Sequence, residues 1–185
     1  MAKRIMLMLV LAVVSAGVLS GCGTVVKEGL GATMGPKGTF VPIRPVAPAD
    51  ESRPLGEYKR FELGAFTDDM GGKVPTELLA HLPGGFTDAL IKKKLPNAPS
   101  GKTLLLRGRI SHYEGQGLVW GMLSPIEEVV ARTEMVDKAS GKVLGVANCV
   151  GRTTTRVNKG VAKKGIALGK ALAAWIDARY PKEGR

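Results

Sequence analysis

The segment KTLLLRGRISHY, residues 102–113, alternates between two kinds of side chain. One set of alternate positions holds Leu104, Leu106, Gly108 and Ile110, and the other holds Leu105, Arg107, Arg109 and Ser111. Because successive side chains of a strand point to opposite faces, this pattern predicts a strand with one face on a core and one face toward solvent.

Two further strands are expected on the carboxyl side of this segment, at 126–137 and 142–156. The sequence DKASGK at 137–142 is a hairpin signal, because Asp and Ser bond to nearby backbone and Gly accepts a positive φ. Short connections favour antiparallel neighbours, so we expect the three strands to form an antiparallel meander. A helix over 159–180 follows, and Pro181 ends it.

On the amino side, a strand is expected at 58–66, followed by a helical pattern. Its apolar residues recur every four positions: Val74, Leu78, Leu82, Phe86 and Leu90. Pro83-Gly84-Gly85 interrupts the pattern, which predicts a kink or two short helices. The fold class is therefore α+β: a mainly antiparallel sheet of about four strands, with helices packed on one face.

The last helix carries small residues at four-residue spacing: Gly165, Gly169 and Ala173. Small side chains let a helix approach a neighbouring element closely. We favour tight packing of this helix on the sheet over a self-association face. The four lysines at 159, 163, 164 and 170 exclude a membrane span here.

The amino terminus has the layout of a secretory signal. Lys3-Arg4 precedes an apolar run over 5–14, and Leu19-Ser20-Gly21-Cys22 follows. These four residues resemble the lipobox of bacterial lipoproteins: Leu, Val or Ile, then Ala, Ser or Thr, then Gly or Ala, then Cys. The resemblance implies cleavage after Gly21 and acylation of Cys22. We favour this interpretation over a transmembrane helix, because the apolar run is short.

The signal peptide would span 1–21. Glycines and five prolines between 23 and 54 predict a flexible but extended tether after Cys22, with a single strand near 39–43 as an open alternative. The domain would span 55–180, with a tail at 181–185. Gly23 resembles the pattern of lipoproteins sent to the outer membrane, which implies the periplasmic face of that membrane in a Gram-negative host.

The chain has 27 Lys and Arg against 16 Asp and Glu, a formal net charge of +11. Removing 1–21 takes away Lys3 and Arg4 and no acidic residue, which leaves a net charge of about +9. A basic protein favours anionic partners such as lipid headgroups, cell-wall polymers, acidic proteins or nucleic acid. Export makes nucleic acid the least fitting of these partners. The alternative explanation of the positive charge is that it serves solubility alone.

Patterns that would indicate catalysis are missing. Cys149 lies in an apolar run, which favours a buried, inert thiol. His81 and His112, with Asp68 and Asp69 as possible neighbours, have no metal-ligand spacing. The adjacent Glu127 and Glu128 should face opposite sides of a strand, so they cannot act as a pair. We therefore expect no catalytic residues, no metal, no cofactor and no enzymatic activity.

The segment 115–123 is the candidate interaction loop. It places Leu118, Trp120 and Met122 among glycines between two expected strands. Aromatic and methionine side chains on a loop are suitable binding anchors. A loop that folds back over the core is the alternative, and the sequence favours neither.

The expected elements follow one order: a strand, a helix, a strand with Leu-x-Leu-x-Gly-x-Ile at 104–110, a hairpin at 137–142 and a helix rich in small residues. This order resembles that of a widespread bacterial lipoprotein family with a domain of unknown function. The plan is also similar to the α/β domains of the TolB amino-terminal part, the curli secretion lipoprotein and the outer-membrane penicillin-binding-protein activators. The resemblance implies a membrane-anchored binding or assembly module for an envelope protein or peptidoglycan, with oligomerisation left open. The alternative is a hydrolase or transferase acting on envelope polymers.

Overall fold

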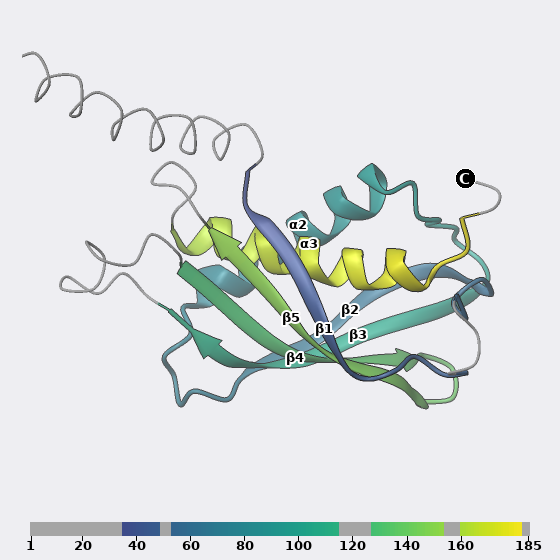
Figure 1. Ribbon diagram of the computed structural model, residues 1–185, viewed down its shortest axis with the longest axis horizontal. Coiled ribbons are helices and arrows are strands. Elements are labelled where there is room, and N and C mark those ends of the chain that lie inside the picture. Colours follow the sequence, from purple (N-terminus) through teal and green to yellow (C-terminus); the bar gives the residue numbers. More distant parts are fainter. Residues whose placement is uncertain (1–34, 49–52, 115–126, 154–159, 183–185) are drawn as a thin grey trace, which may run out of the picture.

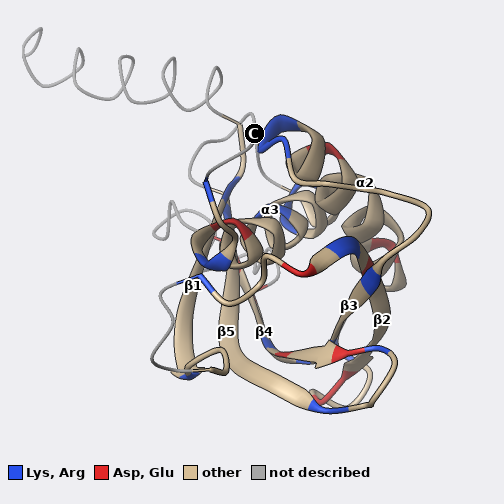
Figure 2. Cartoon of the chain, turned by 90° about the vertical axis from the view of Figure 1, so that its right-hand side faces the viewer, with Lys and Arg blue, Asp and Glu red and all other residues tan. Residues whose placement is uncertain are grey.

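The computed structural model describes residues 35–48, 53–114, 127–153 and 160–182. The elements are β1 (Lys37–Arg44), β2 (Tyr58–Asp68), α2 (Thr76–Lys92), β3 (Lys102–Tyr113), β4 (Glu127–Asp137), β5 (Val143–Thr153) and α3 (Val161–Arg179). The strands form one sheet in the order β1-β5-β4-β3-β2. Both helices cover the same face of this sheet (Figure 1), and no helix of the described ranges lies on the opposite face (Figure 2). We call that opposite face the open face.

The expected meander is confirmed, but the sheet is mixed. β3, β4 and β5 are consecutive antiparallel neighbours. β2, in contrast, runs parallel to β3, because α2 lies between them and carries the chain back to the same end of the sheet. The expectation of about four mainly antiparallel strands is thus corrected to five strands in a mixed sheet.

The fifth strand comes from residues that we assigned to the tether. Lys37–Arg44 forms β1, which pairs antiparallel with β5 at one edge of the sheet. An edge strand tolerates a proline, and the β1–β5 register shifts between Pro42 and Arg44. Gly38 allows the strand to lie directly against α3, since a Cβ there would be 2.2 Å from the Ala171 nitrogen. The folded part therefore begins well before residue 55.

The interruption expected at Pro83-Gly84-Gly85 does not divide the helix. A single helix runs over Thr76–Lys92 with Pro83 inside it, so the expectation of two short helices is wrong. Pro83 and Gly84 lie on the exposed side, whereas Gly85 is buried against α3. A Cβ at Gly85 would lie 2.5 Å from the Ile166 Cα, so this glycine serves the packing of two helices.

The small residues of α3 pack closely inside the domain, but the expectation that they pack on the sheet is only partly right, because Gly165 and Gly169 lie against α2. A Cβ at Gly165 would lie 2.4 Å from the Leu78 oxygen, and one at Gly169 would lie 2.4 Å from the Phe86 nitrogen. The neighbouring side of α3, which includes Ala167 and Ala171, meets β1 and β5. Within the described ranges, neither helix has the length and apolar character needed to cross a bilayer.

Candidate functional site: an arginine-lined hollow on the open face

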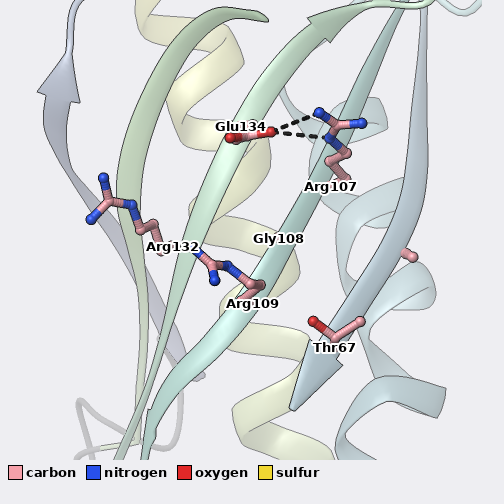
Figure 3. A pocket seen from close by; sticks show the side chains of 7 residues that line it. Thr67, Arg107, Gly108, Arg109, Arg132 and Glu134 are labelled. Carbon is pink, nitrogen blue, oxygen red and sulfur yellow. Dashed lines mark hydrogen bonds and ion pairs between the residues drawn. The ribbon is translucent and has the colours of Figure 1, made fainter. Parts of the chain in front are cut away.

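A hollow of about 340 Å³ lies on the open face over β2, β3 and β4. It is lined by Ala65, Thr67, Arg107, Gly108, Arg109, Arg132 and Glu134 (Figure 3), and we call it the arginine hollow. Strand alternation places the charged residues there. Leu106 and Ile110 of β3 are buried under the helices, so Arg107 and Arg109 between them point to the other face.

The hollow forms where small residues lie between long side chains. Ala65 lies within a shift in the β2–β3 register between Leu63 and Phe66. At Gly108 a Cβ would lie 2.8 Å both from the Arg132 carbonyl oxygen and from the Phe66 Cε1. A larger residue at Gly108 would therefore collide with the β4 backbone and the Phe66 ring, so the close pairing of β3 with its neighbours requires this glycine.

Two of the three arginines have acidic partners. The Nε and Nη2 atoms of Arg107 both lie 3.0 Å from Glu134 Oε2, across the β3–β4 pair (Figure 3). Arg109 Nη1 lies 3.3 Å from Asp69 Oδ2, just beyond the end of β2. Both arginines remain half exposed, so each has donors directed to solvent.

Arg132 is arranged differently. It stands directly opposite Arg109 in the antiparallel register of β3 and β4. Its other cross-strand partner is Asn148 of β5, and it makes no ion pair with any described residue. Like charges directly opposite each other destabilise a strand pair, so this position is electrostatically unfavourable in the unliganded protein.

An arginine cluster of this kind suits an acidic group. Each guanidinium is planar and offers a fork of donors that matches a carboxylate or a phosphate in a bidentate geometry. The one carboxylate in the lining, Glu134, is already held by Arg107. General acid–base catalysis on a glycoside needs two free carboxyl groups, and the lining does not provide them. The arrangement can bind and orient an anion.

Cys149 lies where the sequence predicted, buried in the core on β5. Burial raises the pKa of its thiol to about 12, and a hydrogen bond with Thr133 only partly offsets this. The thiol is therefore protonated at neutral pH and is a poor nucleophile. The burial expected for Cys149 is confirmed.

The other polar residues considered from the sequence do not converge. His81 lies on the exposed side of α2, and His112 lies on β3. Asp68 accepts hydrogen bonds from the backbone of Met70 and Val74 in the turn after β2. Desolvation acts to raise the pKa of Asp68, but these backbone donors outweigh it and lower the pKa. Among the described residues, no three His, Cys, Asp or Glu side chains are placed to hold a metal.

The adjacent glutamates of β4 face opposite sides, as expected. Glu128 is on the open face, with Oε2 2.8 Å from Arg152 Nε. Glu127 is buried on the helix side, where its Oε2 lies 3.1 Å from Lys164 Nζ. These two carboxylates therefore belong to two separate ion pairs.

Lys164 also contacts the two strand ends that border residues 115–126. Lys164, only 1% exposed, also donates to the Glu114 carbonyl oxygen and lies 4.5 Å from the centre of the Tyr113 ring. Tyr113 and Glu114 are at the end of β3, and Glu127 begins β4. Leu118, Trp120 and Met122 themselves lie outside the described residues, as do Gly21 and Cys22.

Comparisons with known proteins were made on sequence and on fold. No family model matches the sequence, and no curated protein matches it. A PelC variant, a dodecamer from Paraburkholderia phytofirmans, is 15% identical over 78% of this chain and 99% of its own, with a TM-score of 0.48. A second crystal form of the PelC dodecamer is 16% identical with the same coverage and a TM-score of 0.37.

A minor lipoprotein from Acinetobacter baumannii also has a similar structure. It is 14% identical over 65% of this chain and 90% of its own, with a TM-score of 0.35. Identities at this level are too low to transfer an activity or an assembly from these proteins to this chain.

Proposed function

We propose that this protein is a lipid-anchored lipoprotein of the cell envelope, and that its domain binds an acidic partner through the arginine hollow. Leu19-Ser20-Gly21-Cys22 supports the anchor, because it matches the lipobox at every position. Export and the basic charge favour partners with exposed carboxylate or phosphate groups. Peptidoglycan and acidic envelope proteins both carry such groups.

One observation carries the binding role: Arg132 faces Arg109 across β3 and β4 without an acidic partner among the described residues. The nearby arginines have such partners, namely Arg107 with Glu134 and Arg152 with Glu128. A bound anion between Arg109 and Arg132 would relieve their repulsion and complete the same pattern.

The proposed role is non-enzymatic. The alternative, an enzyme acting on envelope polymers, needs a nucleophile or a carboxyl pair. The hollow offers one carboxylate, and Arg107 holds it. We also retain Leu118, Trp120 and Met122 as proposed partner contacts, since aromatic and methionine side chains on a loop are suitable binding anchors.

Co-sedimentation with isolated peptidoglycan sacculi tests the proposed function. The wild-type protein should sediment with the sacculi at low salt and be released at high salt. Arg132→Gln should lose most of this binding, whereas the matched control Arg152→Gln removes the same charge from the same face and should retain it. Equal binding by both variants would show that the hollow is not the site.

A protein partner is tested in parallel by a crosslinking pull-down of the lipidated protein from its own membranes. A captured partner that is lost with Arg132→Gln and kept with Arg152→Gln would identify an acidic protein instead of peptidoglycan.

A further inference from the structure

A second basic surface lies on the opposite side of the domain, on the outer side of the helix layer. It consists of Lys92 and Lys94 at the end of α2 and Lys163 and Lys170 on α3, and we call it the lysine ridge. Figure 2 shows basic residues at the outer end of α2, away from the open face of the sheet. The ridge and the arginine hollow are therefore separated by the helices and the sheet.

The lysines of the ridge act on one another. Partial burial lowers the pKa of Lys170, and the positive charges of Lys92 and Lys163 lower it further, against the opposing effect of Asp88. Lys93 does not add to the ridge, because its Nζ lies 3.0 Å from Asp177. Lys92, Lys163 and Lys170 are thus close enough to interact, with Asp88 opposing them at Lys170, and such a concentration of positive charge favours an anionic surface.

The chain enters the domain on this ridge. Lys170 Nζ donates a hydrogen bond of 3.1 Å to the Pro36 carbonyl oxygen, just before β1 begins at Lys37. Twelve residues, 23–34, lie between Cys22 and Gly35, and the chain from one to the other can span at most about 45 Å when fully extended. A bilayer that held the Cys22 acyl chains would therefore be within reach of the ridge.

One apolar side chain accompanies the lysines. Ile91 is 70% exposed, the most exposed large hydrophobic residue among those described, and it directly precedes Lys92. A surface that combines lysines with an exposed aliphatic side chain is typical of proteins that lie on a lipid interface.

From the charge, the chain entry and Ile91 we infer that the lysine ridge docks on the anionic phospholipid headgroups of the membrane that anchors the protein. This inference rests on the lipid anchor of the proposed function. Each lysine near an anionic membrane surface changes the ratio of docked to undocked protein by about fivefold. Docking of the ridge would direct the arginine hollow away from the bilayer, toward partners in the aqueous space.

The test uses the full lipidated protein in vesicles, with an environment-sensitive fluorophore on Ile91→Cys. Cys149 is buried and Cys22 would carry lipid, so the label is specific. We expect higher, blue-shifted emission on vesicles that contain phosphatidylglycerol than on phosphatidylcholine alone, and loss of the difference at about 1 M salt, where the Debye length falls to about 3 Å. A label at Lys142→Cys, in the β4–β5 turn, should show no difference.

Charge removal gives the second arm of the test. The double variant Lys163→Ala/Lys170→Ala should lower the docked ratio by about 25-fold, on the basis of fivefold per lysine. Lys102→Ala/Lys142→Ala removes the same charge elsewhere and should dock like the wild type. Equal emission on both lipids, with the protein bound to both, overturns the docking alone. Protein that carries no lipid on Cys22 and binds neither vesicle overturns the anchor and the docking together.

Discussion

The two faces of β4 differ in whether their charged side chains have partners of opposite charge. On the helix side, Glu127 is buried and its carboxylate is matched by Lys164 at 3.1 Å. On the open face, five residues along, Arg132 stands opposite Arg109 with no acidic partner among the described residues. The first arrangement is what a fold needs, because a buried charge without a partner is costly. The second contributes nothing to the fold, and this difference is our reason for assigning it to binding.

The largest effect on stability should come from removing the cation that pairs with Glu127 on the helix side of β4. Lys164→Ala leaves Glu127 buried without its cation, which should reduce the free energy of unfolding by about 3–5 kcal/mol. Lys163→Ala, one residue away on the exposed side, should change it by no more than about 0.5 kcal/mol. Urea denaturation of both variants makes the measurement. Equal, small effects would mean that the two faces of β4 do not differ as described.

Asp137, at the end of β4, is a second compensated charge. Its carboxylate accepts bonds from the Ser140 amide (2.8 Å), the Tyr58 hydroxyl (2.8 Å) and the Ser140 hydroxyl (2.9 Å). With the Ser140 amide as the largest contribution, these donors lower the pKa of Asp137 to about 2. Asp137→Asn should therefore cost about 1.5–3 kcal/mol of unfolding free energy at neutral pH.

The stabilisation by the Asp137 carboxylate should depend on pH. Because the folded pKa lies below the unfolded value of about 3.9, the stabilisation is fully present above about pH 4 and disappears as the pH falls toward 2. The difference in melting temperature between wild type and Asp137→Asn should narrow over this interval. A constant difference would show that the charge of Asp137 is not what stabilises the turn.

On the open face of β4, a substitution of Arg132 should raise the stability of the protein and not lower it. Arg132→Glu replaces a like-charge pair with an opposite-charge pair across from Arg109, so the free energy of unfolding should rise by about 0.2–1 kcal/mol. The same variant should lose binding to an acidic partner. A gain in stability together with a loss of binding would distinguish a binding residue from a structural one. A destabilised Arg132→Glu would show that Arg132 supports the fold.

The smallest effect on stability is expected for Trp120→Ala. If Trp120 is a binding anchor, its truncation should leave the melting temperature close to wild type and lower the affinity for the partner by about 2 kcal/mol or more. A buried tryptophan would instead cost about 3–5 kcal/mol of stability. Thermal denaturation separates the two, and a large fall would make Trp120 part of the core.

The elements that depend on local sequence were predictable. Strict alternation predicted β3, and the Asp137–Lys142 signal predicted the β4–β5 turn, where Gly141 has a φ of 71°. The parallel pairing of β2 was not predictable in this way, because alternation is the same in parallel and antiparallel strands. β1 was difficult to predict because Pro42 lies within it and Pro36 and Pro45 flank it, and prolines occur both in edge strands and in linkers.

The candidate site required information that the sequence does not contain. Alternation placed Arg107 and Arg109 on the face away from the core, but the opposition of Arg109 and Arg132 depends on the β3–β4 register. The burial of Lys164 was predictable from the sequence. It lies four residues before Leu168 and eight before Leu172, in line with two large apolar residues, whereas Lys163 lines up with Ala167 and Lys170. In the sequence, Lys163 and Lys164 form one basic cluster. In the structure, Lys163 is exposed to solvent and Lys164 is buried.

The position of β1 has a mechanical consequence. As the first strand of the described domain, β1 receives any pull applied to the chain ahead of residue 35. A pull along the strand axis would load its antiparallel ladder with β5 in shear, so that several backbone hydrogen bonds resist together, and the close contact of Gly38 with α3 adds to this resistance. The edge strand would thus carry the force between the chain ahead of residue 35 and the sheet that carries the arginine hollow.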